Sequence, residues 1–119
     1  MILLIAMSAV HFTGAVIHLF FSHIWGWARD LENLKNENRL SALTMNGGIA
    51  YFLGFFGTMD LLWAFDLVEK ERLLIIAIIG FWVVRLAMQL FIYDMRQRLS
   101  QMFFIAFVFM IVGHTAILV

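Results

Sequence analysis

The sequence predicts an all-α membrane protein, an antiparallel bundle of four transmembrane helices. The first observation is composition: 64% of the 119 residues are hydrophobic and only 13% are charged, whereas a soluble domain is near half apolar and a quarter charged. A soluble chain of this size also lacks the interior volume to bury so much apolar surface. The second and third observations are four long apolar runs and the short charged segments between them.

The four apolar runs each approach or exceed the roughly 20 residues that span a bilayer. In lipid, an open chain satisfies its backbone polar groups only as a helix. Proline is absent, so we expect continuous helices without proline kinks. The first run is longer than the apolar part of a signal peptide and has no basic segment before it, which predicts a retained helix. The predicted helices, all within one domain (1–119), are 2–28, 41–65, 73–93 and 102–119.

The short connections predict antiparallel neighbouring helices and place both termini on one side of the membrane. Basic residues favour the cytoplasmic side of membrane proteins. The first and third connections carry more of them than the second, so we expect the termini outside, in a multi-pass protein of a bacterial inner (plasma) membrane. The residues compared are Arg29, Lys35, Arg39, Arg96 and Arg98 against Lys70 and Arg72.

Composition also excludes several classes of function. Cysteine is absent, which excludes disulfides, iron–sulfur clusters and cysteine-type zinc sites. The net charge is zero and no basic block is present, so the lipid bilayer and not nucleic acid is the expected partner. No nucleophile–base pair, paired carboxylates or phosphate loop is evident, and the sequence favours a protein that is not an enzyme.

Three polar residues are expected near the outer side of the membrane. Counting about 1.5 Å per residue places His11, Asp60 and His114 at similar depth, about 7–14 Å from the outer interface. Neutral imidazole suits zinc, copper and iron, and a carboxylate can join it. The pair His11 and His114 could also supply two axial ligands to a haem. The hypotheses are therefore haem on the two histidines, a metal ion on all three residues, or hydrogen bonds that only join the helices.

A second group lies at a depth nearer the cytoplasm: His18, Asn46, Arg85 and Gln89. The guanidinium of Arg85 cannot be discharged, so within a membrane it needs a partner. No acidic residue is expected at its depth. Arg85 therefore either belongs to a structural polar cluster with the other three residues or binds an anionic lipid, a quinone or another ligand.

Small residues on the second helix predict close packing. Gly47, Gly54 and Thr58 form one stripe, and small residues let membrane helices approach closely. This stripe predicts packing within the chain or, alternatively, the interface of a homodimer or larger membrane complex.

The third predicted helix carries a residue pattern that resembles a pattern in other membrane proteins. The residues are Phe81-Trp82-x-x-Arg85-x-x-x-Gln89-x-Phe91-x-Tyr93, with His11 early in the first helix and Leu34…Asn38-Arg39 before the second. This pattern resembles that of a loose group of small uncharacterised bacterial four-helix integral membrane proteins. The resemblance implies the four-helix fold and favours His11, Arg85 and Gln89 over the other polar residues. It implies no activity.

Three hypotheses for function follow. The first is a small non-enzymatic accessory or assembly subunit, stabilised by its intramembrane His, Arg and Asp clusters. The second is a membrane bundle that binds haem or a metal ion through His11 and His114. The third is a small proton or ion conductor, because polar positions span much of the membrane depth and histidine titrates near neutral pH. These positions are His18, Arg85, Asp60 and His114.

Overall fold

The computed structural model describes residues 1–24 and 26–119, and this part of the chain is helical with no strand. Four of its helices are long and apolar enough to cross a membrane. They are α1 (Ile2–Leu19), α4 (Asn36–Ala64), α5 (Arg72–Ile92) and α6 (Arg98–Leu118). The structure therefore confirms the all-helical fold with four long helices.

The first helix is shorter than the predicted range 2–28. It ends at Leu19 and is followed by two short helices, α2 (Phe21–Ile24) and α3 (Trp27–Asp30), and by the 3-10 turn η1 (Leu31–Asn33). Gly26 precedes α3 with a φ of 66°, a left-handed conformation that glycine adopts without steric cost. The apolar run thus continues past the point where the backbone turns.

The second and fourth long helices begin earlier than predicted. Helix α4 begins at residue 36 and not at 41, and α6 begins at 98 and not at 102, whereas α5 is shifted by one residue at each end. Residues such as Glu, Arg and Gln have good helix propensity, so the backbone remains helical beyond the apolar run. Hydrophobicity marks the stretch that crosses lipid and not the whole helix.

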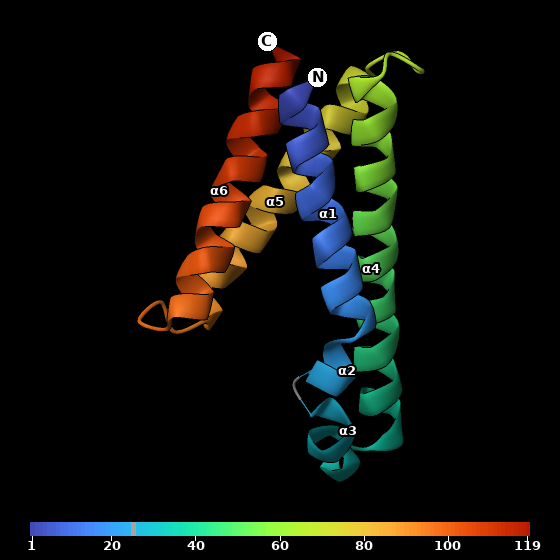
Figure 1. The fold of residues 1–119 in the computed structure, drawn as a ribbon. Helices are drawn as coiled ribbons and strands as arrows, with labels where there is room; N and C mark the ends of the chain where they lie inside the picture. The colour runs from blue at the N-terminus through green and yellow to red at the C-terminus, as the bar shows by residue number, and fades with distance from the viewer. Residues whose placement is uncertain (25) are drawn as a thin grey trace.

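The long helices form two antiparallel hairpins, α1 with α4 and α5 with α6 (Figure 1). Both termini and the α4–α5 connection lie at one end of the molecule, where the hairpins meet. Toward the other end the hairpins diverge (Figure 1). The predicted antiparallel bundle is therefore close-packed at the end that carries the termini and open at the opposite end.

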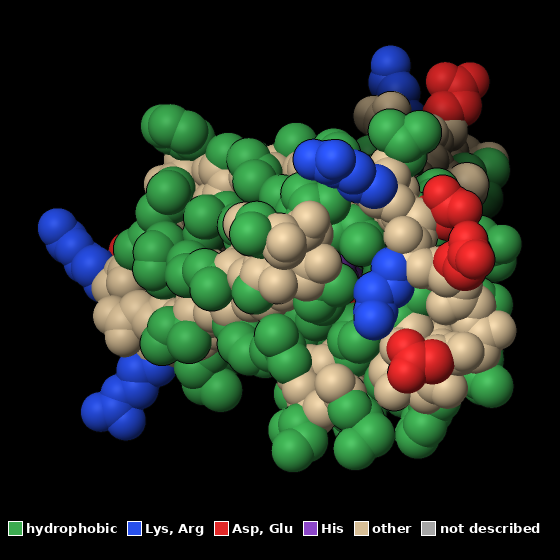
Figure 2. All heavy atoms as spheres, turned by 90° about the horizontal axis from the view of Figure 1, so that it is seen from above, with side chains coloured by type: hydrophobic (Ala, Val, Ile, Leu, Met, Phe, Trp, Pro, Cys, Tyr) green, Lys and Arg blue, Asp and Glu red, His purple; other side chains and the backbone are tan. Residues whose placement is uncertain are grey.

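The outer surface is strongly apolar. Viewed from the end that carries the termini, hydrophobic side chains cover most of the molecule and acidic ones gather mainly on one side (Figure 2). Ile2 and Leu73 are each 80% exposed and Phe91 is 89% exposed. Such extensive exposed apolar surface is exceptional for a soluble monomer. Together with the four candidate spans, it is the surface of a multi-pass membrane protein.

Two glycines allow α1 to approach its neighbours. A Cβ atom at Gly57 of α4 would lie 3.1 Å from the Cβ of His11 and 3.2 Å from the ring of Phe12. A Cβ atom at Gly113 of α6 would clash with the sulfur of Met7. Helix α1 therefore packs over a glycine on each of the two hairpins.

The predicted glycine stripe does not pack within the chain. A Cβ atom at Gly47 or Gly54 would meet no other atom within 4 Å, and the hydroxyl of Thr58 donates to the carbonyl of Gly54 on its own helix. The expectation of packing within the chain is therefore wrong for this stripe, because the face of α4 that meets α1 carries Gly57. A role for the stripe in a homodimer stays a prediction.

Gly57 and Gly54 provide a matched pair of substitutions on one helix. We predict that Gly57→Val lowers the free energy of unfolding by about 1–3 kcal/mol, because the added side chain overpacks the contact with α1. Gly54→Val adds the same side chain in open space and should unfold near the wild-type temperature. Thermal unfolding in detergent, followed by circular dichroism, measures both. Equal losses would contradict the packing of α1 over Gly57.

Candidate functional site

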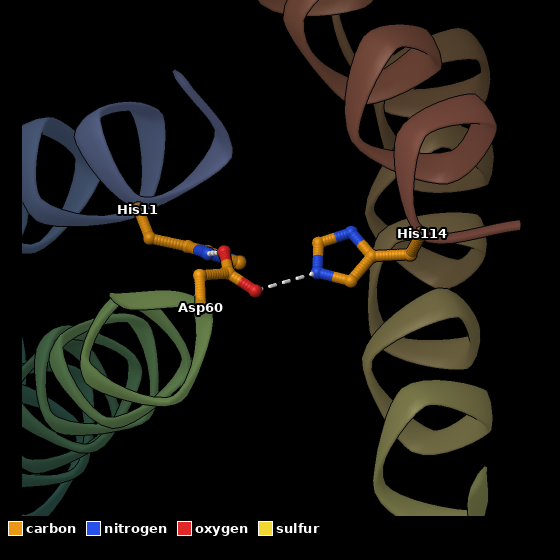
Figure 3. A group of neighbouring side chains, drawn as sticks. All are labelled: His11, Asp60 and His114. Carbon is orange, nitrogen blue, oxygen red and sulfur yellow. Dashed lines mark hydrogen bonds and ion pairs between the residues drawn. The ribbon is translucent and has the colours of Figure 1, made fainter. Parts of the chain in front are cut away.

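A cluster of three buried polar side chains lies where the hairpins meet. His11 of α1, Asp60 of α4 and His114 of α6 each have no exposed surface, and the carboxyl group of Asp60 lies between the two imidazoles (Figure 3). The His11 Nδ1 to Asp60 Oδ2 distance is 2.8 Å, and the His114 Nε2 to Asp60 Oδ1 distance is 3.2 Å. We call these three residues the His–Asp–His cluster. The structure brings together the three residues expected at one depth.

The register of α1 against α4 positions the first half of this cluster. One turn before His11, the hydroxyl of Ser8 donates to the carbonyl of Gly57 at 2.8 Å. One turn after Gly57, Asp60 contacts His11. Both hydrogen bonds are buried, and leaving either partner unpaired would cost free energy. The close approach at Gly57 therefore serves to place His11 against Asp60.

Trp82 of α5 determines which nitrogen of His11 carries a proton. The indole Nε1 of Trp82 donates to Nε2 of His11 at 3.0 Å. Because an indole nitrogen only donates, Nε2 of His11 must be the acceptor and the ring proton lies on Nδ1. That Nδ1–H donates to Asp60.

Sequence reasoning did not include Trp82 among the site residues. Two features of the sequence could have identified Trp82. It lies on the same helical stripe as Arg85 and Gln89, and the indole N–H of a buried tryptophan needs a hydrogen-bond acceptor.

The tautomer of His114 is determined by its own helix. Nδ1 of His114 lies 2.8 Å from the carbonyl oxygen of Met110. A carbonyl oxygen only accepts, so Nδ1 carries a proton and Nε2 faces Asp60. In the part of the chain that the structure describes, every buried side-chain nitrogen and oxygen has a hydrogen-bond partner. Each buried polar atom of the cluster therefore lies within hydrogen-bonding distance of another protein group.

The distances within the cluster suit a metal ion, but the positions of the histidine protons leave too few nitrogen lone pairs to bind one. Ligand atoms of His11, Asp60 and His114 lie within 4.8 Å of one another. A histidine ligand must offer a lone pair to the metal. His11 uses the lone pair of Nε2 for the indole of Trp82 and carries a proton on Nδ1, so it has none left for an ion. The three residues in this arrangement therefore do not fit a metal centre.

A haem between the two histidines meets a different obstacle. The ring centroids of His11 and His114 are 5.6 Å apart, and the carboxyl group of Asp60 binds both rings. The rings of Phe56 and Trp82 lie 5.6 and 5.4 Å from His11. A macrocycle between the histidines would have to displace the carboxyl group, so the site does not fit an axial pair of haem ligands.

A cavity of about 530 Å³ lies between the two hairpins, on the side where they diverge. Its volume is within the range of sites that bind small molecules, about 300–1,000 Å³. Helices α1, α4, α5 and α6 all contribute to its wall, which is mostly apolar. Four of its aromatic rings are Phe81, Trp82, Phe103 and Phe107.

Arg85 lines this cavity and has only an aromatic neighbour for its charge. Its Cζ atom lies 5.5 Å from the centroid of Phe107, a cation–π contact. Within residues 1–24 and 26–119, Arg85 makes no ion pair and no hydrogen bond. The cation therefore faces an apolar cavity without a counter-ion from the described chain.

The four residues predicted to cluster around Arg85 are divided between the hairpins. His18 Nδ1 lies 2.7 Å from Asn46 Oδ1, and Asn46 Nδ2 donates to the carbonyl of His18 at 2.5 Å. Gln89 Nε2 donates to the carbonyl of Ser100 at 3.4 Å. Two of the four residues, His18 and Asn46, are hydrogen-bonded to each other, and a polar cluster that also includes Arg85 stays a prediction. His18 and Gln89 line the cavity with Arg85, and Asn46 holds His18.

Removing the indole donor tests the tautomer of His11. We predict that Trp82→Phe lowers the free energy of unfolding by about 1–3 kcal/mol, because buried Nε2 of His11 loses its partner. Trp63→Phe is the control, since its indole donates to the carbonyl of Glu69 in an exposed connection, where water can replace it. Thermal unfolding in detergent measures both, and an unaffected Trp82→Phe would count against this assignment.

No known protein family matches the chain, and no curated protein or solved structure matches it either.

Proposed function

We propose that this is a non-enzymatic integral membrane protein that binds an anionic amphiphile in the cavity between its two hairpins. The observation that carries the proposal is Arg85, a permanent cation on the wall of an apolar cavity of about 530 Å³. The ligand would place an acidic head group at Arg85 and its apolar part against the aromatic wall.

The charge of Arg85 is the first argument. A guanidinium stays protonated in proteins, and an ionisable group in a membrane-spanning helix pairs with another group or marks a ligand site. The carboxyl group of Asp60 is already bonded to two histidines. The ring of Phe107 attracts the cation by about 0.5–2 kcal/mol but brings no negative charge. A carboxylate or phosphate head group would, and it would match the planar guanidinium.

The shape of the cavity is the second argument. Its wall runs from buried Trp82 to Tyr93 and Gln97, which are exposed near the start of α6. A ligand can therefore enter from that end with its apolar part leading or following. His18 also lines the cavity, and because its Nδ1 donates to Asn46, its Nε2 can accept from a phosphate head group that carries a hydrogen but not from a carboxylate.

A quinone is the alternative ligand for the same cavity, since its ring would suit the aromatic wall. A neutral quinone supplies no charge for Arg85, so we favour the anionic amphiphile. Ligand binding is compatible with an accessory or assembly subunit. The proposal also includes three features that the sequence indicates. The protein lies in a bacterial inner membrane, both of its termini are outside, and it forms a homodimer or a larger complex.

Two earlier hypotheses are not proposed. Haem and metal binding by His11 and His114 conflict with the proton positions and with the place of Asp60. The conductor is not proposed because Nε2 of His11 bonds Trp82, whose indole donates but does not accept a proton.

The proposal predicts charge-dependent stabilisation by ligand. Oleate, at concentrations well above its dissociation constant, should raise the unfolding temperature of the protein in a neutral detergent, because it binds the folded state. Methyl oleate, which has the same chain without the charge, should raise it less. Arg85→Gln should lose the difference, whereas Arg72→Gln, at the exposed start of the same helix, should keep it.

The same series run with phosphatidic acid against phosphatidylcholine distinguishes a phospholipid from a fatty acid as the source of the head group. A short-chain quinone added in place of oleate tests the alternative ligand. Equal stabilisation by oleate and methyl oleate, or an undiminished oleate effect in Arg85→Gln, would contradict the proposal.

A further inference from the structure

When the protons of the His–Asp–His cluster are assigned to their nitrogen atoms, no hydrogen atom remains for the contact between Asp60 and His114. The Nδ1–H of His11 donates to Oδ2 of Asp60, since Trp82 occupies Nε2. The Nδ1–H of His114 donates to the carbonyl of Met110. If both histidines are neutral and Asp60 is ionised, the remaining contact joins a lone pair on His114 Nε2 to a carboxylate oxygen at 3.2 Å. Two acceptors cannot form a hydrogen bond.

We propose that the Asp60–His114 contact is a proton-binding site that holds one additional proton. The proton can occupy either of two positions. It lies on Oδ1 of Asp60 beside a neutral His114, or on Nε2 of His114 beside the carboxylate of Asp60. In either state the contact becomes a hydrogen bond and the cluster has no net charge. The pair shares the proton, so the state belongs to both residues together.

Burial makes the unprotonated cluster costly. Asp60 and both histidines have no exposed surface, and an isolated charge without a compensating partner is expensive in such surroundings. The groups that face Asp60 are His11 from α1 and His114 from α6, and α5 contributes Trp82, which is not ionisable. Arg85, also on α5, lies over Phe107 and lines the cavity. The proton itself therefore supplies the missing positive charge.

The position of the site gives the proton a structural consequence. Two buried hydrogen bonds join the α1–α4 hairpin to the α5–α6 hairpin: Trp82 to His11, and His114 to Asp60. The second of these exists only when the proton is bound. Protonation therefore fastens α6 to α4 at the end of the molecule where the hairpins meet. This inference does not depend on ligand binding at Arg85.

Asp60→Asn is a direct mimic of the protonated state. The carbonyl oxygen of an asparagine at this position can accept from His11, and its amide can donate to Nε2 of His114, with no additional proton. Asp60→Ala has neither group and leaves Nδ1 of His11 and Nε2 of His114 without a partner.

The stability of these two variants tests the site. Asp60→Asn should unfold within about 2 °C of wild type, whereas Asp60→Ala should unfold roughly 5–10 °C lower, as expected for buried groups that lose their partners. Asp66→Asn, at an exposed position, controls for the change in charge. An Asp60→Asn variant that is destabilised as much as Asp60→Ala would overturn the proposal.

Nuclear magnetic resonance of the full chain in micelles observes the proton itself. With ¹⁵N-labelled histidine and ¹³C-labelled aspartate at neutral pH, His11 should be neutral with its proton on Nδ1. The Asp60–His114 pair should show either a protonated carboxyl with a neutral imidazole or a carboxylate with an imidazolium. A carboxylate beside a neutral His114 means that no additional proton is bound, and this result would overturn the proposal.

Discussion

The structure depends on one carboxyl group that binds side chains from two different hairpins. Asp60 is on α4, its first partner His11 is on the neighbouring α1, and its second partner His114 is on α6. All three side chains are buried. Leaving a buried polar group unpaired costs more free energy than a typical hydrogen bond contributes to stability. The cluster therefore sets both the pairing of α1 with α4 and the point where the second hairpin joins the first. The glycines beneath α1 permit the close approach that this geometry needs.

The same arrangement explains why the two ends of the molecule differ. At the end with the termini, every buried polar side-chain atom that the structure describes has a partner within the protein. At the other end the hairpins separate (Figure 1), and Arg85 faces a cavity with an aromatic wall and no acidic partner in the described chain. Trp82 lies on the boundary, because its indole N–H binds His11 while its ring lines the cavity. The closed end supports the fold, and the open end has the chemistry for a ligand.

Much of the fold was accessible from the sequence, because long apolar runs in lipid can only be helices and the helical rise converts residue number into depth. Depth placed the three members of the His–Asp–His cluster together. Depth did not identify the hydrogen-bond partners of the second group, since it contains no lateral distance: His18 pairs with Asn46 and Gln89 with Ser100. Trp82 was missed because the direction of an indole N–H depends on the rotation of its helix. The turns at Phe20 and Gly26 were missed because hydrophobicity does not report backbone geometry.

The most direct test of this account is the separation of α1 from α6 at the two ends of the molecule. The chain has no cysteine, so spin labels can be attached to two introduced cysteines and their distance measured by pulsed electron paramagnetic resonance in lipid nanodiscs. One pair, at the exposed positions Ile2 and Thr115, reports the end with the termini, and the other, at Leu19 and Arg98, reports the opposite end. We predict a clearly shorter distance for the first pair than for the second. Equal distances would describe helices packed along their whole length and would contradict hairpins that are joined at the cluster and open beyond it.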